Sequence, residues 1–135
     1  MEIKIRRDRS GTMRHVVNVG SHTFPIDLAV ESGGEDSGVD PHDLYDSAVG
    51  GCKALTVLWY ANRKGIPVED ITVTVTRDGS GERSGLYRLR TVLEVTGDLT
   101  EEQRQELLKV AGKCPVHKLM TQVTTEIETE LVAAD

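Results

Sequence analysis

The longest apolar segment of the chain covers residues 41–65, PHDLYDSAVGGCKALTVLWYANRKG. Apolar or small side chains recur there at steps of three or four residues, which is the spacing of one helix face. The members of this stripe are Leu44, Ala48, Cys52, Leu55 and Trp59. Further apolar residues on either side widen the stripe, so that little of the middle of the segment is polar. The pattern predicts a long, buried central helix over 41–65.

Both ends of this segment carry helix-boundary signals. Asp40 can cap the start and Pro41 suits the first helical position, while Gly65 after Arg63-Lys64 is typical of a helix end. Within the helix, the pair Gly50-Gly51 costs about 1 kcal/mol per glycine relative to alanine. We therefore expect a packed element or a ligand to approach the backbone closely at this point.

Alternating apolar and polar residues predict strands on both sides of the helix. Three short runs within residues 1–28 predict an antiparallel N-terminal meander, and Pro25 in the third run either places that strand at an edge or shortens it. Two longer alternating runs predict a β-hairpin over 70–96, and the alternation at 123–132 predicts a C-terminal strand.

Residues 100–121 predict two further helices. Thr100 and Gln103 form a capping-box pattern, and Leu107, Leu108 and Ala111 form the expected buried face of the first helix. Pro115 is suited to open the second helix, which makes Cys114 its N-cap. The complete order predicts a single α+β domain over 1–135, with antiparallel sheets around a long buried central helix.

Composition and charge exclude several classes of function. The chain has 135 residues and a net charge of -6, with 22 acidic against 16 basic side chains, so we expect no nucleic-acid partner. No segment has the roughly 20 apolar residues of a membrane span, and the N-terminal residues lack the apolar region of a signal peptide. We therefore expect no membrane partner and a cytoplasmic location.

The two cysteines, Cys52 and Cys114, are either buried small side chains or redox-active thiols. At a helix N-terminus, and with Lys113 and Lys118 nearby, Cys114 is expected to favour the thiolate. Cys52 lies in mid-helix and needs a partner from elsewhere in the fold. The candidates are arginines of the N-terminal strands: Arg6, Arg7, Arg9 and Arg14.

Metal and cofactor motifs are missing from the sequence. The two cysteines and four histidines do not have the spacing of metal ligands, and both His42 and His117 are more typical of surface or capping positions. The GGEDSG segment carries two acids and lacks the lysine of a phosphate-binding loop. We expect neither a metal ion nor an organic cofactor.

Two segments together, GGEDSGVDPHDLYDSAVGGCKALTVLWYANRKGIPVE and the later GKCPVHKLM, resemble the OsmC/Ohr family of osmotically inducible and organic hydroperoxide resistance proteins. The match is closer to its OsmC-like subgroup. The resemblance implies an intertwined homodimer and a thiol peroxidase for organic hydroperoxides. In that chemistry the residue matching Cys52 becomes a sulfenic acid, the residue matching Cys114 condenses with it to a disulfide, and a dithiol or a lipoyl protein reduces the disulfide.

One departure from the family pattern concerns thiolate activation. In the peroxidases proper a glutamate follows the helix-opening proline and holds an arginine, whereas here His42 occupies that position. Asp43 and Arg14 are the candidates for the activating pair. This departure leaves two alternatives open: a redox-sensing or small-ligand-binding dimer with little turnover, and a structural stress protein with inert thiols.

Overall fold

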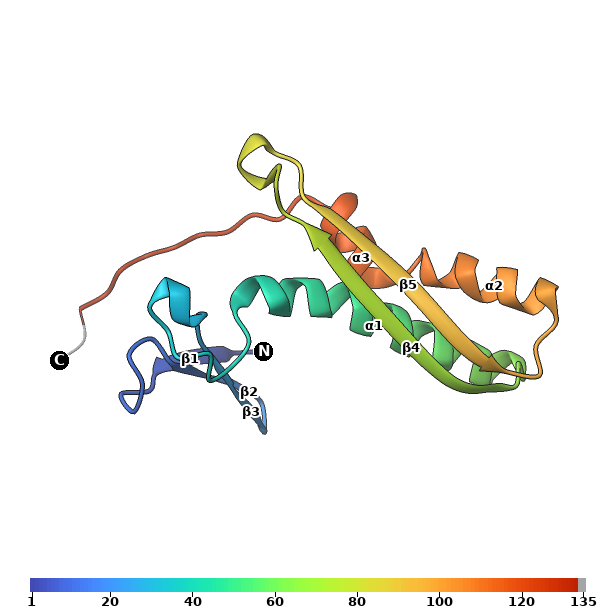
Figure 1. Ribbon diagram of the computed structural model, residues 1–135, viewed down its shortest axis with the longest axis horizontal. Helices are drawn as coiled ribbons and strands as arrows, with labels where there is room; N and C mark the ends of the chain where they lie inside the picture. The colour runs from blue at the N-terminus through green and yellow to red at the C-terminus, as the bar shows by residue number, and fades with distance from the viewer. Residues whose placement is uncertain (134–135) are drawn as a thin grey trace. The chain divides into compact units, whose positions relative to one another are not determined.

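The computed structural model describes residues 1–133, which form two compact units, Met1–Ser47 and a second unit that begins at Ala48 (Figure 1). Helix α1 (Pro41–Lys64) begins in the first unit and continues through the second. The predicted helix over 41–65 is confirmed, including its end at Gly65, which adopts φ +70°.

The first unit contains the predicted antiparallel meander. Its strands are β1 (Ile3–Arg7), β2 (His15–Val19) and β3 (His22–Ile26), in the order β1-β2-β3. Pro25 lies in β3 opposite Val16, and β3 is the last strand in the sheet order, so the edge placement, one of the two predicted alternatives, is confirmed. A short 3-10 turn, η1 (Val30–Ser32), follows in the connection to α1.

The second unit adds the predicted hairpin and two helices to α1. Strands β4 (Val68–Asp78) and β5 (Arg88–Gly97) pair antiparallel, with the 3-10 turn η2 (Glu82–Ser84) in their connection. Helix α2 (Glu101–Ala111) has the predicted capping box, because Thr100 Oγ1 accepts from the Gln103 N–H at 3.1 Å and Gln103 Oε1 accepts from the Thr100 N–H at 2.9 Å. Helix α3 (Pro115–Thr121) follows, with Cys114 at its N-cap.

The core of the second unit lies between the C-terminal half of α1, the hairpin and α2. Its buried members are Val57, Ala61, Ile66, Leu107 and Ala111, and side chains of β4 and β5 pack against them. The Tyr60 hydroxyl donates a short hydrogen bond to Glu106, which ties α1 to α2. This hydrogen bond and burial raise the pKa of Tyr60.

The expected burial of α1 is wrong for one of its faces. Val49, Val57 and Ala61 are buried, whereas Leu55 and Trp59 of the predicted stripe are 72% and 60% exposed. The hairpin and α2 cover only one side of the helix, so the core face is turned by about one residue, or 100°, from the predicted stripe. The exposed apolar stripe, here defined as Leu55, Leu58 and Trp59, is therefore uncovered within the single chain.

The close approach expected at the glycine pair occurs at Gly50. A Cβ added there would lie 2.5 Å from Val75 Cγ2 of β4, whereas a Cβ added at Gly51 would meet nothing within 4 Å. Gly50 therefore allows β4 to pack directly on the α1 backbone.

Gly50→Ala is expected to be less stable than Gly51→Ala. Both substitutions gain up to about 1 kcal/mol of helix propensity, but only the first forces the Val75 side chain to move, at a cost of about 1–3 kcal/mol. Urea unfolding of the two variants measures the difference. Equal midpoints would contradict the close contact between α1 and β4.

Two other expectations differ from the structure. Leu108 is 58% exposed, because only Leu107 and Ala111 of the predicted α2 face turn toward α1. The C-terminal strand expected over 123–132 is not formed, since residues 124–133 have neither helix nor strand and are exposed. Alternation supplies the side-chain pattern of a strand, but a strand also needs a neighbour for its hydrogen bonds.

Candidate functional site

The candidate site lies in the second unit and begins with Cys52 on α1. This cysteine is half-buried, and its sulfur lies 3.9 Å from Thr56 Oγ1, one helical turn further on. The partial exposure leaves the thiol accessible to a small molecule.

Cys114 is fully buried at the N-cap of α3. The sequence-based expectation of a favoured thiolate is wrong, because burial raises the pKa of the Cys114 thiol. The backbone N–H of His117 and the charge of Lys53 lower this pKa, but they do not offset the burial. The net effect of this environment favours the neutral thiol of Cys114 over its thiolate.

The fold brings the two cysteines together, although they lie 62 positions apart in the chain. A hydrogen bond with the Cys52 thiol, and the charge that this thiol can carry, further raise the pKa of Cys114. Both cysteines are unpaired thiols in the structure. An accessible sulfur in contact with a buried one is a suitable arrangement for sulfenic acid formation followed by condensation.

Lys53, the residue after Cys52, is a charged side chain in the interior. It is only 4% exposed, and its Nζ donates to the Ala111 carbonyl at the end of α2, at 2.8 Å. The C-terminal carbonyls of a helix are a favourable place for a cation. The same carbonyl accepts a hydrogen bond of 3.4 Å from the Cys114 N–H.

The second contact of Lys53 defines the tautomer of His117. Lys53 Nζ lies 2.8 Å from His117 Nδ1, and an ammonium group has donors only. Nδ1 therefore accepts, and the neutral imidazole carries its proton on Nε2. His117 thus has a specific contact in the site, beyond the surface or capping role that the sequence favoured.

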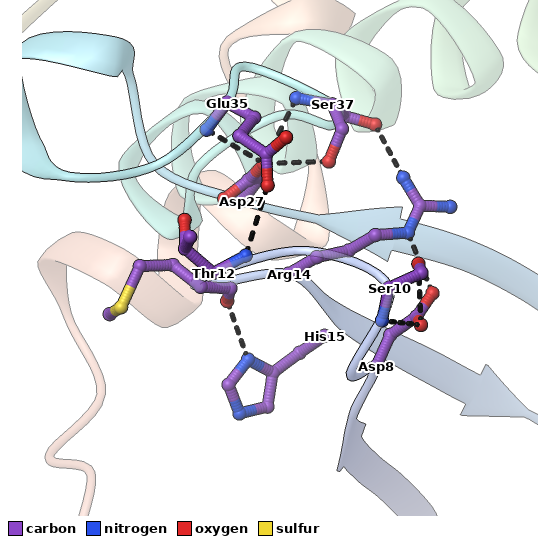
Figure 2. A network of polar contacts seen from close by, with 9 residues as sticks. Asp8, Ser10, Thr12, Arg14, His15, Asp27, Glu35 and Ser37 are labelled. Atoms are coloured by element: carbon purple, nitrogen blue, oxygen red, sulfur yellow. Dashed lines mark hydrogen bonds and ion pairs between the residues drawn. The ribbon is translucent and has the colours of Figure 1, made fainter.

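Arg14, the predicted thiolate partner, belongs to the first unit and has an acidic partner there (Figure 2). Its Nε donates to Asp8 Oδ2 at 2.8 Å, and its Nη1 donates to the Ser37 carbonyl at 3.0 Å. These contacts connect the β1–β2 turn to the loop that precedes α1.

The loop before α1 is organised by the carboxylate of Asp27, which is 4% exposed. Oδ2 accepts from the Ser37 hydroxyl at 2.6 Å, from the Ser37 N–H at 3.0 Å and from the Glu35 N–H at 3.2 Å. The Ser37 hydroxyl and N–H are the main reasons that the pKa of Asp27 is lowered to about 2.

Asp27→Asn is expected to lower the melting temperature at pH 7 by several degrees. An amide at this position would point an N–H₂ group or a weaker acceptor at three donors. In the native chain, the stabilisation by the Asp27 carboxylate is present above its unfolded pKa of about 4 and is lost as the pH falls through about 2. Thermal melts of the native chain and of Asp27→Asn between pH 2 and 7 test this prediction. Glu31→Gln, at an exposed position, is the control, and its melting temperature is expected to change little. An equal loss of melting temperature in both variants would contradict the role of Asp27.

Asp43, the other candidate for thiolate support, closes the N-terminus of α1. Its N–H donates to Asp40 Oδ1 at 2.9 Å, and its Oδ2 accepts from the Asp40 N–H at 3.2 Å. This is a reciprocal capping box with aspartates at both positions. His42 precedes Asp43 on the first turn and is exposed.

No group of three or more His, Cys, Asp or Glu side chains within residues 1–133 is placed to hold a metal ion. In the same part of the chain, no helix is both long and apolar enough to cross a membrane.

Comparison with known proteins decides the family. The model of the OsmC-like protein family matches residues 34–130. The chain belongs to the OsmC-like family. This OsmC-like protein has no match among curated protein sequences.

Solved structures share the fold of this OsmC-like protein. An OsmC-like protein from Mycoplasma pneumoniae has a TM-score of 0.71 at 19% identity, covering 90% of this chain and 87% of the other. An organic hydroperoxide resistance protein OsmC from Legionella pneumophila has a TM-score of 0.66 at 20% identity, with coverages of 90% and 88%. The organic hydroperoxide resistance protein OhrB of Bacillus subtilis has a TM-score of 0.58 at 25% identity, and 90% of each chain is covered.

Sequence reasoning missed Lys53 as a member of the site. A lysine in an apolar helix is seldom buried without partners, so its place next to Cys52 in GGCKAL was the available signal. Its partners on α2 and α3 come from residues 58 and 64 positions away, and no local pattern connects them.

Proposed function

We propose that this OsmC-like protein is a thiol-dependent peroxidase that reduces organic hydroperoxides. The observation that carries the proposal is the contact between the accessible thiol of Cys52 and the buried thiol of Cys114. The names of the relatives from Legionella pneumophila and Bacillus subtilis, both organic hydroperoxide resistance proteins, support the substrate class.

In the proposed reaction, the Cys52 thiolate attacks one oxygen of the peroxide bond. The O–O bond breaks, the alkoxide leaves and takes up a proton to give the alcohol, and Cys52 becomes a sulfenic acid. Cys114 then condenses with it, forming the disulfide and releasing water. A dithiol, such as a lipoyl group on a carrier protein, restores both thiols by exchange.

The different burial of the two sulfurs supports this division of roles. The peroxidatic thiol must meet a substrate, and Cys52 is the more exposed of the two. The resolving thiol needs only to reach the sulfenic acid, which fits the buried Cys114. Leu55, next on the exposed stripe, favours alkyl or lipid hydroperoxides over hydrogen peroxide. Thiolate support by Arg14 and Asp43 stays a prediction.

A homodimer is part of the proposal. The exposed apolar stripe of α1 follows Cys52 along the helix, and covering it with a second copy would remove large apolar side chains from water. The bare backbone at Gly51 leaves room for close helix packing. The partner would also enclose the surroundings of Cys52.

Treatment with one equivalent of cumene hydroperoxide tests the proposed function. Intact mass should show the loss of two hydrogens, and peptide mapping should place the disulfide between Cys52 and Cys114. Sustained alcohol production with dihydrolipoamide should follow. If neither a sulfenic acid nor a disulfide forms, the peroxidase proposal is rejected.

A redox-sensing dimer is the second candidate. It is favoured by the Arg14 guanidinium, which is already engaged by Asp8 and so is less available to support a thiolate. A sensor would oxidise once and slowly, whereas the enzyme turns over many times with dithiol. Turnover under excess peroxide and dihydrolipoamide distinguishes the two.

A further inference from the structure

Lys53 connects the two chain segments on either side of Cys114. Its Nζ donates at 2.8 Å to the carbonyl of Ala111, three residues before this cysteine. It also donates at 2.8 Å to Nδ1 of His117, three residues after it. One ammonium group is therefore held between the two segments that flank Cys114, and its charge acts on the Cys114 thiol.

Neither acceptor of Lys53 carries a negative charge. Taking an ammonium out of water is costly unless an anion or several acceptors compensate for it. A carbonyl and a neutral imidazole satisfy two of the three N–H donors, which leaves the positive charge itself without compensation from these two contacts. A thiolate at Cys114 would supply the missing negative charge.

We propose that Lys53 is a positioning residue for the resolving step, where its ammonium group stabilises the Cys114 thiolate that attacks the sulfenic acid of Cys52. In this step the sulfur–sulfur bond forms and the S–O bond of the sulfenic acid breaks. The leaving hydroxide combines with the proton lost from Cys114 to give water, so the Cys114 sulfur is oxidised and the Cys52 sulfur is reduced. The inference rests on the proposed function and adds a residue to the same site.

Two titratable side chains and one backbone N–H act on the Cys114 sulfur from the elements packed around it. Cys52 and Lys53 come from α1 and the N–H of His117 comes from α3, and of these the Lys53 charge and the His117 N–H favour the thiolate. Lys113 and Lys118 are exposed, so solvent and salt screen their charges. Lys53 is the lysine whose charge acts in the interior.

A thiolate titration tests this role without any peroxide. In a Cys52→Ser background, the absorbance of the Cys114 thiolate near 240 nm is followed with pH. Adding Lys53→Met is expected to raise the apparent pKa of Cys114 by about one unit. The matched control Lys113→Met removes an exposed lysine next to the same cysteine and should leave the titration unchanged.

Lys53→Gln provides a second variant in case Lys53→Met does not fold, which circular dichroism melts will show. The glutamine keeps a donor for the interior and removes only the charge, so it should shift the titration in the same direction. An unchanged pKa in a folded Lys53 variant, or an equal shift in Lys113→Met, would overturn the inference.

The resolving rate gives an independent readout in the chain with both cysteines. After one equivalent of cumene hydroperoxide, Lys53→Met is expected to form the disulfide about three- to fourfold more slowly. A higher Cys114 pKa leaves about tenfold less thiolate, but each thiolate of a more basic thiol is a stronger nucleophile, which offsets part of this loss. Dimedone should trap more of the Cys52 sulfenic acid. Disulfide formation at the native rate in Lys53→Met would overturn the inference. If the native chain itself forms no sulfenic acid, the proposed function is rejected, and the thiolate titration alone tests the role of Lys53.

Discussion

Cys52→Ser is expected to reduce hydroperoxide turnover by about a thousandfold or more, because the nucleophile of the first step is lost. Cys114→Ser should behave differently. It should consume one equivalent of peroxide and stop at a sulfenic acid, since the buried partner thiol is missing. Coupled turnover with dihydrolipoamide measures the first effect, and dimedone labelling followed by intact mass measures the second.

The two serine variants form a matched pair, because each exchanges one sulfur for one oxygen. Circular dichroism should show that both keep α1 and the hairpin. The opposite result, in which Cys114→Ser cannot be oxidised while Cys52→Ser forms a sulfenic acid, would reverse the assigned roles. Undiminished turnover in Cys52→Ser would exclude the peroxidatic role of this residue.

Local signals in the sequence were sufficient to predict most of the elements. The capping box at Thr100, the proline at the start of α1 and the N-cap position of Cys114 all occur where the sequence placed them. Each depends on residues within one turn of a helix, so each can be recognised without knowledge of the tertiary fold.

Tertiary packing determined the features that the sequence did not reveal. The buried face of α1 includes Lys53. Because lysine is charged, it interrupts the apolar periodicity from which a buried face is predicted. The exposed stripe instead has the stronger apolar pattern, because Leu55 and Trp59 are large. The sequence pattern alone places such a stripe in the core of the chain. A stripe that packs against a second copy of the protein has the same pattern, so the two cases cannot be distinguished from the sequence.

The environment of Cys114 shows the same limit. Its N-cap position and the nearby lysines favour a thiolate, but burial has the larger effect on its pKa. Burial depends on α1, which is distant in sequence, so the direction of the shift could not be inferred from the CPVHK segment alone. The contact between the two thiols likewise arises only when α1 and α3 meet.

The double substitution Leu55→Lys and Trp59→Lys is expected to convert the proposed dimer into a monomer at micromolar concentration. These side chains are 72% and 60% exposed in the single chain, so the change should cost the isolated fold little. At an interface, each lost apolar side chain removes about 1.5–3 kcal/mol, and both copies carry the change. The resulting loss is several kcal/mol, or at least a thousandfold in the dissociation constant. Sedimentation velocity measures the association.

The control for this experiment is Leu108→Lys, which places the same charge on an exposed apolar position of α2 away from the stripe. It should remain a dimer. A native chain that sediments as a monomer, or a stripe variant that still dimerises, would contradict the proposed interface. Because Leu55 lies one turn beyond Cys52 on α1, an interface here also predicts that the monomeric variant loses much of its peroxide turnover while its Cys52 thiol alkylates faster. Separate measurement of association, turnover and alkylation therefore tests whether the second copy encloses the reactive sulfur or only stabilises the fold.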